Sequence, residues 1–161
     1  MTKPRLSLLR YWQAAERMRI HFSEAHGVER PLRDEYRDTR IHMTLWYGML
    51  HVVIEGWHEL KETDAEIDGM LNDNVDLLRR FRNGAFHFQK EEFDDRFMKL
   101  ITDGTDVVAW VTQLTAAFGR WFDEQERANP TSTKVWEILE AIQPQLKAAI
   151  AEEMAMMRHE K

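Results

Sequence analysis

The chain contains no cysteine. Disulfide bonds and thiolate-ligated metal sites are therefore excluded, and we expect a protein of the reducing cytoplasm. Four prolines and seven glycines in 161 residues are too few for the turn-rich sequence of an all-β protein. No apolar run reaches the roughly 18 residues of a membrane span. The N-terminus also lacks the apolar stretch of a secretory signal peptide, so we expect no membrane association.

Positive and negative charges are distributed unevenly along the chain. The net charge is −6, which argues against broad, sequence-independent binding of nucleic acid. Residues 1–40 nevertheless hold nine basic and six acidic side chains, whereas residues 88–161 hold nine basic and fourteen acidic ones. Any contact with RNA is therefore expected to be local, through the N-terminal arginines and those around Arg82.

Apolar residues recur at helical spacing along most of the chain. Hydrophobic residues make up 43% of it, which is enough for one core. We therefore expect an all-α fold, an antiparallel helical bundle of about five to seven helices, forming a single domain over residues 1–161. The segment 41–60 is apolar nearly all round and predicts the central, buried helix. The other predicted helices are 5–25, a segment opened by Pro31, a short helix after residue 63, 73–88, 93–101, 106–128 and a final segment over 131–150.

Local signals predict how some of these helices begin and end. Thr63 and Glu66 have the spacing of a capping box, so a helix is predicted to begin with Thr63 as its N-cap. Pro144 lies inside the apolar pattern of the final segment, where it predicts a kink or a short break. Three methionines near the end of the chain are interpreted as flexible filler against the bundle, with a partner-binding patch as the alternative. They are Met154, Met156 and Met157.

The segment Leu77–Phe88 combines arginine, asparagine, glycine and histidine within one apolar repeat. At about 100° per residue, Phe81 lies at the centre of the core-facing side. Arg82 and His87 flank the opposite side and lie about 140° apart on an unbroken helix. Either Gly84 breaks the helix, or a second copy of the chain completes a site. The outward-facing side is predicted to carry Arg79, Asn83 and Phe86.

Arg82, Asn83 and His87 follow a pattern of arginine, polar residue, three variable residues and histidine. This pattern resembles the signature of the HEPN superfamily (higher eukaryotes and prokaryotes nucleotide-binding). The resemblance implies an all-helical, usually dimeric protein, and many such proteins are metal-independent endoribonucleases of toxin–antitoxin and anti-phage systems. Some toxins of the superfamily have a tyrosine two residues after the histidine. Gln89 stands at that position, so modification there by a nucleotidyltransferase is not expected.

The resemblance implies a role for each residue of this segment. His87 is expected to transfer protons, because an imidazole titrates close to neutral pH. Arg82 is expected to hold the scissile phosphate with its charged fork, and Asn83 to orient one of these two side chains by an amide hydrogen bond. Arg79 and Arg80 are expected to bind substrate as further cations. The expected ligand is single-stranded RNA, with no metal and no cofactor, and the expected protein partners are a second copy of the chain and a cognate antitoxin.

Two other sites compete with this one. The same arginine–histidine spacing occurs at Arg37 and His42. His51, Glu55 and His58 share a face of the predicted central helix and include one Glu-x-x-His, whereas a di-iron bundle needs two such motifs and two further glutamates. We interpret these three residues as polar positions at the edge of a core helix.

Two further alternatives concern binding without catalysis. Four arginines recur at three- and four-residue steps and form either a solvated face paired with nearby carboxylates or a stripe that follows a phosphate backbone. The whole chain can also be a helical interaction module, antitoxin-like or scaffold-like, without an active site. The four arginines are Arg30, Arg33, Arg37 and Arg40.

Overall fold

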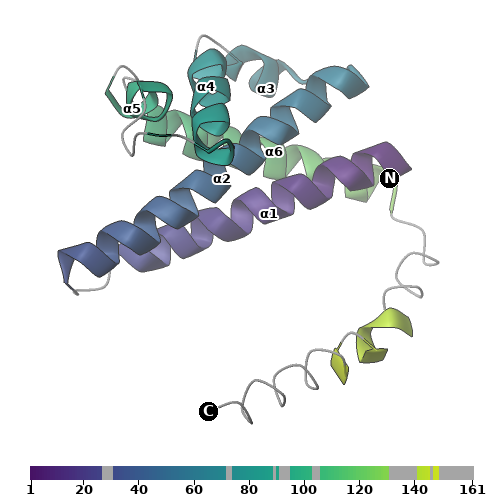
Figure 1. The fold of residues 1–161 in the computed structure, drawn as a ribbon. Coiled ribbons are helices and arrows are strands. Elements are labelled where there is room, and N and C mark those ends of the chain that lie inside the picture. Colours follow the sequence, from purple (N-terminus) through teal and green to yellow (C-terminus); the bar gives the residue numbers. More distant parts are fainter. Residues whose placement is uncertain are drawn as a thin grey trace. The chain divides into compact units, whose positions relative to one another are not determined.

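The computed structural model describes residues 1–26, 31–71, 74–88, 90, 95–102, 106–130, 141–145 and 147–148. The described residues form helices and connecting segments, with no strand among them, so the all-α prediction is confirmed (Figure 1). Six helices have defined bounds, and residues 141–145 and 147–148 are helical as well. The six are α1 (Lys3–His26), α2 (Leu32–Leu60), α3 (Ala65–Met70), α4 (Asn74–Phe86), α5 (Asp95–Thr102) and α6 (Val107–Ala128).

The chain divides into two compact units. Residues Thr2–Glu124 form one, and Met1 with Gln125–Lys161 forms the other. Most of the second unit lies outside the described residues, including the expected cap at 131–133 and the three C-terminal methionines. Pro144 lies within the helical stretch 141–145. The expectation of a single domain over residues 1–161 stays a prediction.

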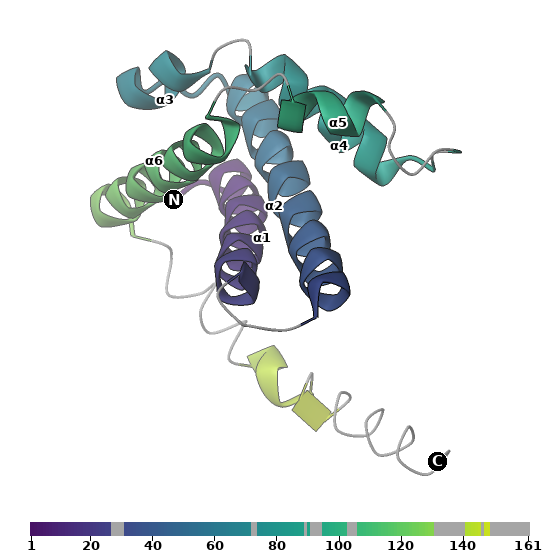
Figure 2. The ribbon, with the colours of Figure 1, turned by 90° about the vertical axis from the view of Figure 1, so that its left-hand side faces the viewer.

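Helix α2 is the centre of the larger unit. It runs antiparallel to α1 along one side, while α4 crosses it on another side with α5 next to α4 (Figures 1 and 2). The central position predicted for residues 41–60 is confirmed, because Trp46, Leu50 and Trp57 are at most 1% exposed. The helix is longer than expected, since the segment after Pro31 and the segment 41–60 form one continuous helix of 29 residues.

Helix α6 packs on α1 and α2 through aromatic side chains. Trp57 of α2 meets Trp121 edge-on, with ring centroids 4.9 Å apart. Thr115, which is fully buried, accepts a hydrogen bond on its hydroxyl from Trp46 Nε1 at 3.0 Å and one on its carbonyl from Trp12 Nε1 at 2.9 Å. Buried indole groups require such partners, so these bonds fix the three helices against one another.

The start of α3 differs from the prediction. Asp64, not Thr63, is the N-cap, and its carboxylate accepts hydrogen bonds from the backbone N–H groups of Glu66 and Ile67. The backbone N–H of Asp64 in turn donates a hydrogen bond to the carboxylate of Asp68 at 3.1 Å. The predicted capping box of Thr63 and Glu66 is therefore wrong, because the neighbouring aspartate forms the cap. A carboxylate at this position is favourable, since the helix N-terminus carries a partial positive charge.

Among the helices within the described part of the chain, none combines the length and the apolar character that crossing a bilayer would require.

Candidate functional site

Two aromatic contacts fix α4 on α2. The rings of Phe81 and Tyr47 lie 5.5 Å apart between centroids. Five residues later, Phe86 lies over Gly48 so closely that a Cβ atom at Gly48 would be 2.1 Å from Phe86 Cε2. Gly84 is buried within α4 and does not break the helix, which continues to Phe86. The expectation that Phe86 simply faces outward is corrected, because the residue is 44% exposed but its ring also covers Gly48 of α2.

Two of the three arginines of α4 share a carboxylate partner, whereas the third bonds to an amide. Arg79 and Arg80 are exposed and share one carboxylate, with Asp76 Oδ1 2.6 Å from Arg79 Nη2 and Oδ2 2.8 Å from Arg80 Nε. The hydrogen bond from Arg79 is the main cause that lowers the pKa of Asp76. Arg82 is half-buried, and its Nη1 donates to Asn83 Oδ1 at 3.0 Å. The expected amide hydrogen bond is therefore present, and among the described residues Arg82 has no carboxylate partner.

His87 is the first residue after α4. Its backbone N–H donates to the carbonyl of Asn83 at 3.3 Å, and the residue is exposed. Phe86 on one side of it is 44% exposed, and Phe88 on the other side is 93% exposed. The pairing of Arg82 with His87 across a dimer axis needs a second chain and stays a prediction. Gln89 lies outside the described residues.

A residue that the sequence did not connect to this segment lies beneath it. His51 of α2 is 3% exposed, and its Nδ1 has no hydrogen-bond partner. Burial lowers the pKa of His51, Glu55 on the same helix raises it, and the charges of Arg82 and Arg79 lower it. The arginines of α4 therefore lie within electrostatic range of this buried imidazole. In the sequence, the signal for this buried residue was a histidine within the most apolar segment. That signal did not indicate which helix would cover the side chain.

The two competing sites are less well assembled. His51 is buried, whereas Glu55 and His58 are exposed, and within the described part of the chain no three His, Cys, Asp or Glu side chains are placed to hold a metal ion together. Arg37 lies 3.3 Å from Asp34, whereas the ring of His42 lies 5.5 Å from that of His21 on α1. Arg37 and His42 therefore have separate contacts among the described residues, and a joint site at this pair stays a prediction.

The stripe of N-terminal arginines agrees in part with a solvated face. Arg37 is 3.3 Å from Asp34 and 3.7 Å from Asp38, so its charge is compensated locally. Arg33 and Arg40 are exposed on the same helix, and Arg30 lies outside the described residues.

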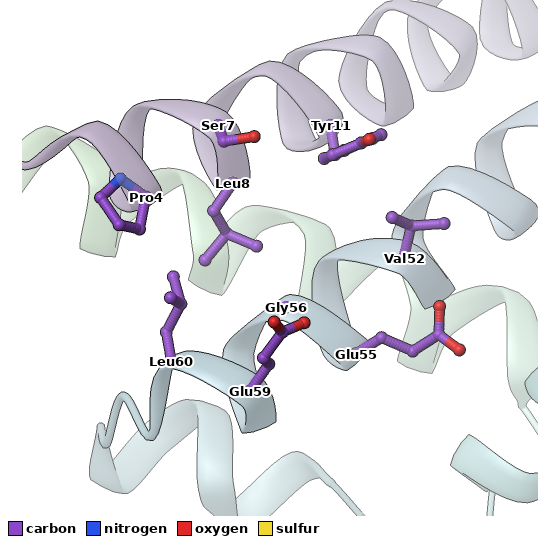
Figure 3. A pocket seen from close by; sticks show the side chains of 9 residues that line it. All are labelled: Pro4, Ser7, Leu8, Tyr11, Val52, Glu55, Gly56, Glu59 and Leu60. Atoms are coloured by element: carbon purple, nitrogen blue, oxygen red, sulfur yellow. The ribbon is translucent and has the colours of Figure 1, made fainter.

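A groove of about 400 Å³ lies between the first half of α1 and the second half of α2 (Figure 3). Tyr11 borders it on the side of α1, and Glu55 and Glu59 border it on the side of α2 (Figure 3). None of the residues of the arginine–histidine motif lines it. Glu55 lines this groove and also lies close to the buried imidazole of α2, since its Oε2 is 3.6 Å from His51 Nδ1.

The arrangement on α4 fits an anion better than a metal. A guanidinium has five N–H donors, and Asn83 uses one of those of Arg82. The remaining donors can bind phosphate oxygens, and the exposed residue His87 follows directly after the helix. Comparisons of the chain with protein-family models, with curated proteins and with solved structures gave no match, so its function has to be inferred from these residues.

Proposed function

We propose that this chain is an RNA-directed domain of the HEPN type that acts as a homodimer in the cytoplasm and cleaves single-stranded RNA without a metal. Arg82 binds the scissile phosphate, Asn83 orients its guanidinium, and His87 transfers protons. Arg79 and Arg80 bind the flanking backbone. The observation that carries the proposal is the bond between Arg82 and the neutral amide of Asn83, because this bond orients the cation without cancelling its charge.

The contrast among the arginines of α4 supports this assignment. Asp76 compensates part of the charge of Arg79 and Arg80, so these two residues retain a shared positive charge. Arg82 bonds to a neutral amide and has no carboxylate partner among the described residues, and its half-buried position is one in which a partner anion is screened less than in water. An anion that binds at this end of α4 is therefore expected to contact Arg82.

The chemistry needs no metal. The 2′-hydroxyl oxygen attacks the neighbouring phosphorus, and the bond from phosphorus to the 5′-oxygen breaks. A base takes the proton of the 2′-hydroxyl, and an acid gives a proton to the leaving 5′-oxygen. In a symmetric dimer, His87 of one protomer serves as the base and the same residue of its partner serves as the acid. Arginine stabilises the negative charge that develops on the phosphate, and the products carry a 2′,3′-cyclic phosphate and a 5′-hydroxyl.

Exposed apolar surface next to His87 supports the dimer. Phe88 is 93% exposed, so its aromatic side chain is available to pack against a partner. A two-fold interface brings identical patches together. If Phe88 packs against its counterpart, the two copies of His87 come close to the same axis.

The experiment is cleavage of labelled single-stranded RNA in the presence of EDTA. We expect wild-type protein to release cyclic-phosphate ends, and His87→Ala and Arg82→Gln to lose at least about a hundredfold of this activity. The matched controls are His58→Ala and Arg17→Gln, since both residues are exposed on other helices, and both variants should cleave like the wild type. Cleavage that survives His87→Ala, or a strictly monomeric protein in light scattering, would refute the proposal.

The second candidate is a helical interaction module without catalysis, and the exposure of Phe88 favours it equally. Its partner would be a second copy of the chain or a cognate antitoxin protein. A dimer that leaves RNA intact and dissociates in a Phe88→Ser variant would support this function over the nuclease.

A further inference from the structure

Two histidines meet where α1 and α2 run antiparallel to each other (Figures 1 and 2). The ring centroids of His21 on α1 and His42 on α2 lie 5.5 Å apart, with 33° between the ring planes. Zinc binds an imidazole nitrogen at about 2.0–2.1 Å in a tetrahedral arrangement, which places the centroids of two rings on one ion roughly 5 Å apart. The two helices therefore hold this pair close to the separation that a shared metal ion requires.

The hydrogen bonding of His21 suits a metal ligand. Its Nδ1 lies 3.1 Å from Oε2 of Glu24, which is three residues further along α1. A metal-ligating histidine usually donates its other ring N–H to a carboxylate, which fixes the tautomer and makes the free nitrogen more basic. With the proton on Nδ1, the lone pair of Nε2 is available for a ligand. The side chain is 41% exposed, so an ion can reach it from solvent.

His42 belongs to a part of α2 where polar atoms lack partners. Its Nδ1 is buried without a hydrogen-bond partner among the described residues, and the same holds for Oγ1 of Thr39. These two residues are three positions apart and therefore share a face of the helix. A buried polar atom without a partner is costly to the fold. An ion with its bound waters would remove this cost, whereas a contact between the two rings alone leaves it in place.

We propose that His21 and His42 together bind a divalent transition-metal ion of the zinc class, which cross-links α1 to α2. Imidazole nitrogen is a suitable ligand for zinc, copper and nickel. Within the described part of the chain, no three His, Cys, Asp or Glu side chains are placed to hold an ion together. Water therefore fills the remaining positions, as it does at zinc sites with an open position. The site is independent of the proposed function, because neither histidine belongs to the segment of α4 that would bind RNA.

The test is a titration of the full chain with zinc chloride at about pH 7.5, after EDTA has removed any bound metal and has itself been removed. Neutral imidazole is the form that binds metal. We expect calorimetry to detect one ion per chain that depends on both histidines. The melting temperature should rise by roughly 5–10 °C at a zinc concentration about a hundredfold above Kd.

Variants at the two helices locate the ion. His21→Gln and His42→Gln should each raise Kd at least about tenfold, since even the loss of an outer partner of a metal ligand typically has an effect of this size. His58→Gln changes an exposed histidine elsewhere on α2 and should bind zinc like the wild type. Wild-type affinity in both His21→Gln and His42→Gln would refute the proposal.

Two further outcomes bear on the same site. Weaker binding in His26→Gln but not in His21→Gln would place the ion at His26 and Glu35, whose Nδ1 and Oε1 lie 3.8 Å apart, and would also refute the proposal. NMR of the wild-type protein decides the matter even if a variant does not fold. Zinc should shift the ring nitrogen resonances of His21 and His42 together, and the proposal is wrong if either histidine keeps its metal-free resonances.

Discussion

The contact between Phe86 and Gly48 gives the sharpest test of how α4 sits on α2. A methyl group added at Gly48 would lie 2.1 Å from Phe86 Cε2 and 2.6 Å from Cζ. Alanine in place of glycine inside a helix normally stabilises by roughly 0.5–1 kcal/mol. Overpacking against an adjacent ring normally costs about 1–3 kcal/mol. In the wild-type background, Gly48→Ala is therefore expected to be neutral or destabilising by up to about 2 kcal/mol.

The same substitution should change sign once the ring is removed. In a Phe86→Ala background the added methyl meets no ring, so Gly48→Ala should stabilise by about 1 kcal/mol. The coupling energy of this double-mutant cycle is then about 1–3 kcal/mol, measured by urea unfolding followed through tryptophan fluorescence. The control is Gly69→Ala in α3, where an added Cβ meets nothing within 4 Å, so this change should be equally favourable in both backgrounds. Additive effects of Gly48→Ala and Phe86→Ala would show that the ring does not lie on the glycine.

Three further predictions concern stability. The hydroxyl of Tyr47 is buried without a hydrogen-bond partner, and burial raises its pKa to about 12. Tyr47→Phe should therefore leave the unfolding free energy unchanged or raise it by about 1 kcal/mol. A clear loss of stability in thermal unfolding would instead reveal a partner for the hydroxyl. Asp64→Ala should cost about 1 kcal/mol of stability through loss of the N-cap, whereas Thr63→Ala should change stability by less than about 0.5 kcal/mol. If Thr63→Ala proves the more destabilising of the two in urea unfolding, Thr63 is the N-cap. Burial and the nearby arginines lower the pKa of His51 in the folded state, so the unfolded state takes up its proton first and stability falls as the pH drops below about 6.5 toward that lowered pKa. This residue contributes a slope of at most about 1.4 kcal/mol per pH unit, and a pH–stability curve that is identical in His51→Gln would contradict the prediction.

Local sequence patterns were sufficient for most of the helices. The apolar repeat of residues 106–128 gave α6 nearly to its ends, because the spacing of its buried residues depends only on the geometry of one helix. Helix boundaries were predicted less accurately where more than one neighbouring residue could act as the N-cap. Thr63 and Asp64 are both good N-caps, and the hydrogen bond between Asp64 and Asp68 is part of the folded structure rather than of the pattern.

In the candidate site, too, local contacts could be predicted from the sequence and contacts between distant segments could not. The bond between Arg82 and Asn83 joins sequence neighbours, so it could be expected from the sequence. The position of His51 beneath the arginines of α4 could not, because the two segments are separated by α3 and meet only where the helices cross.

What the sequence by itself determined is the helical character of the chain, the central place of α2 and the arginine–histidine segment at the end of α4. The tertiary structure decided how the helices approach one another, and glycines mark the close contacts. Gly48 accepts Phe86 of α4, Gly56 accepts Leu8 of α1, and Gly119 accepts Trp12 of α1. A glycine inside a helix has no side chain whose periodicity could indicate a partner. The physical reason is that helix formation depends on residues three or four apart, whereas the crossing of two helices depends on which distant side chain fills the space that a missing Cβ leaves open.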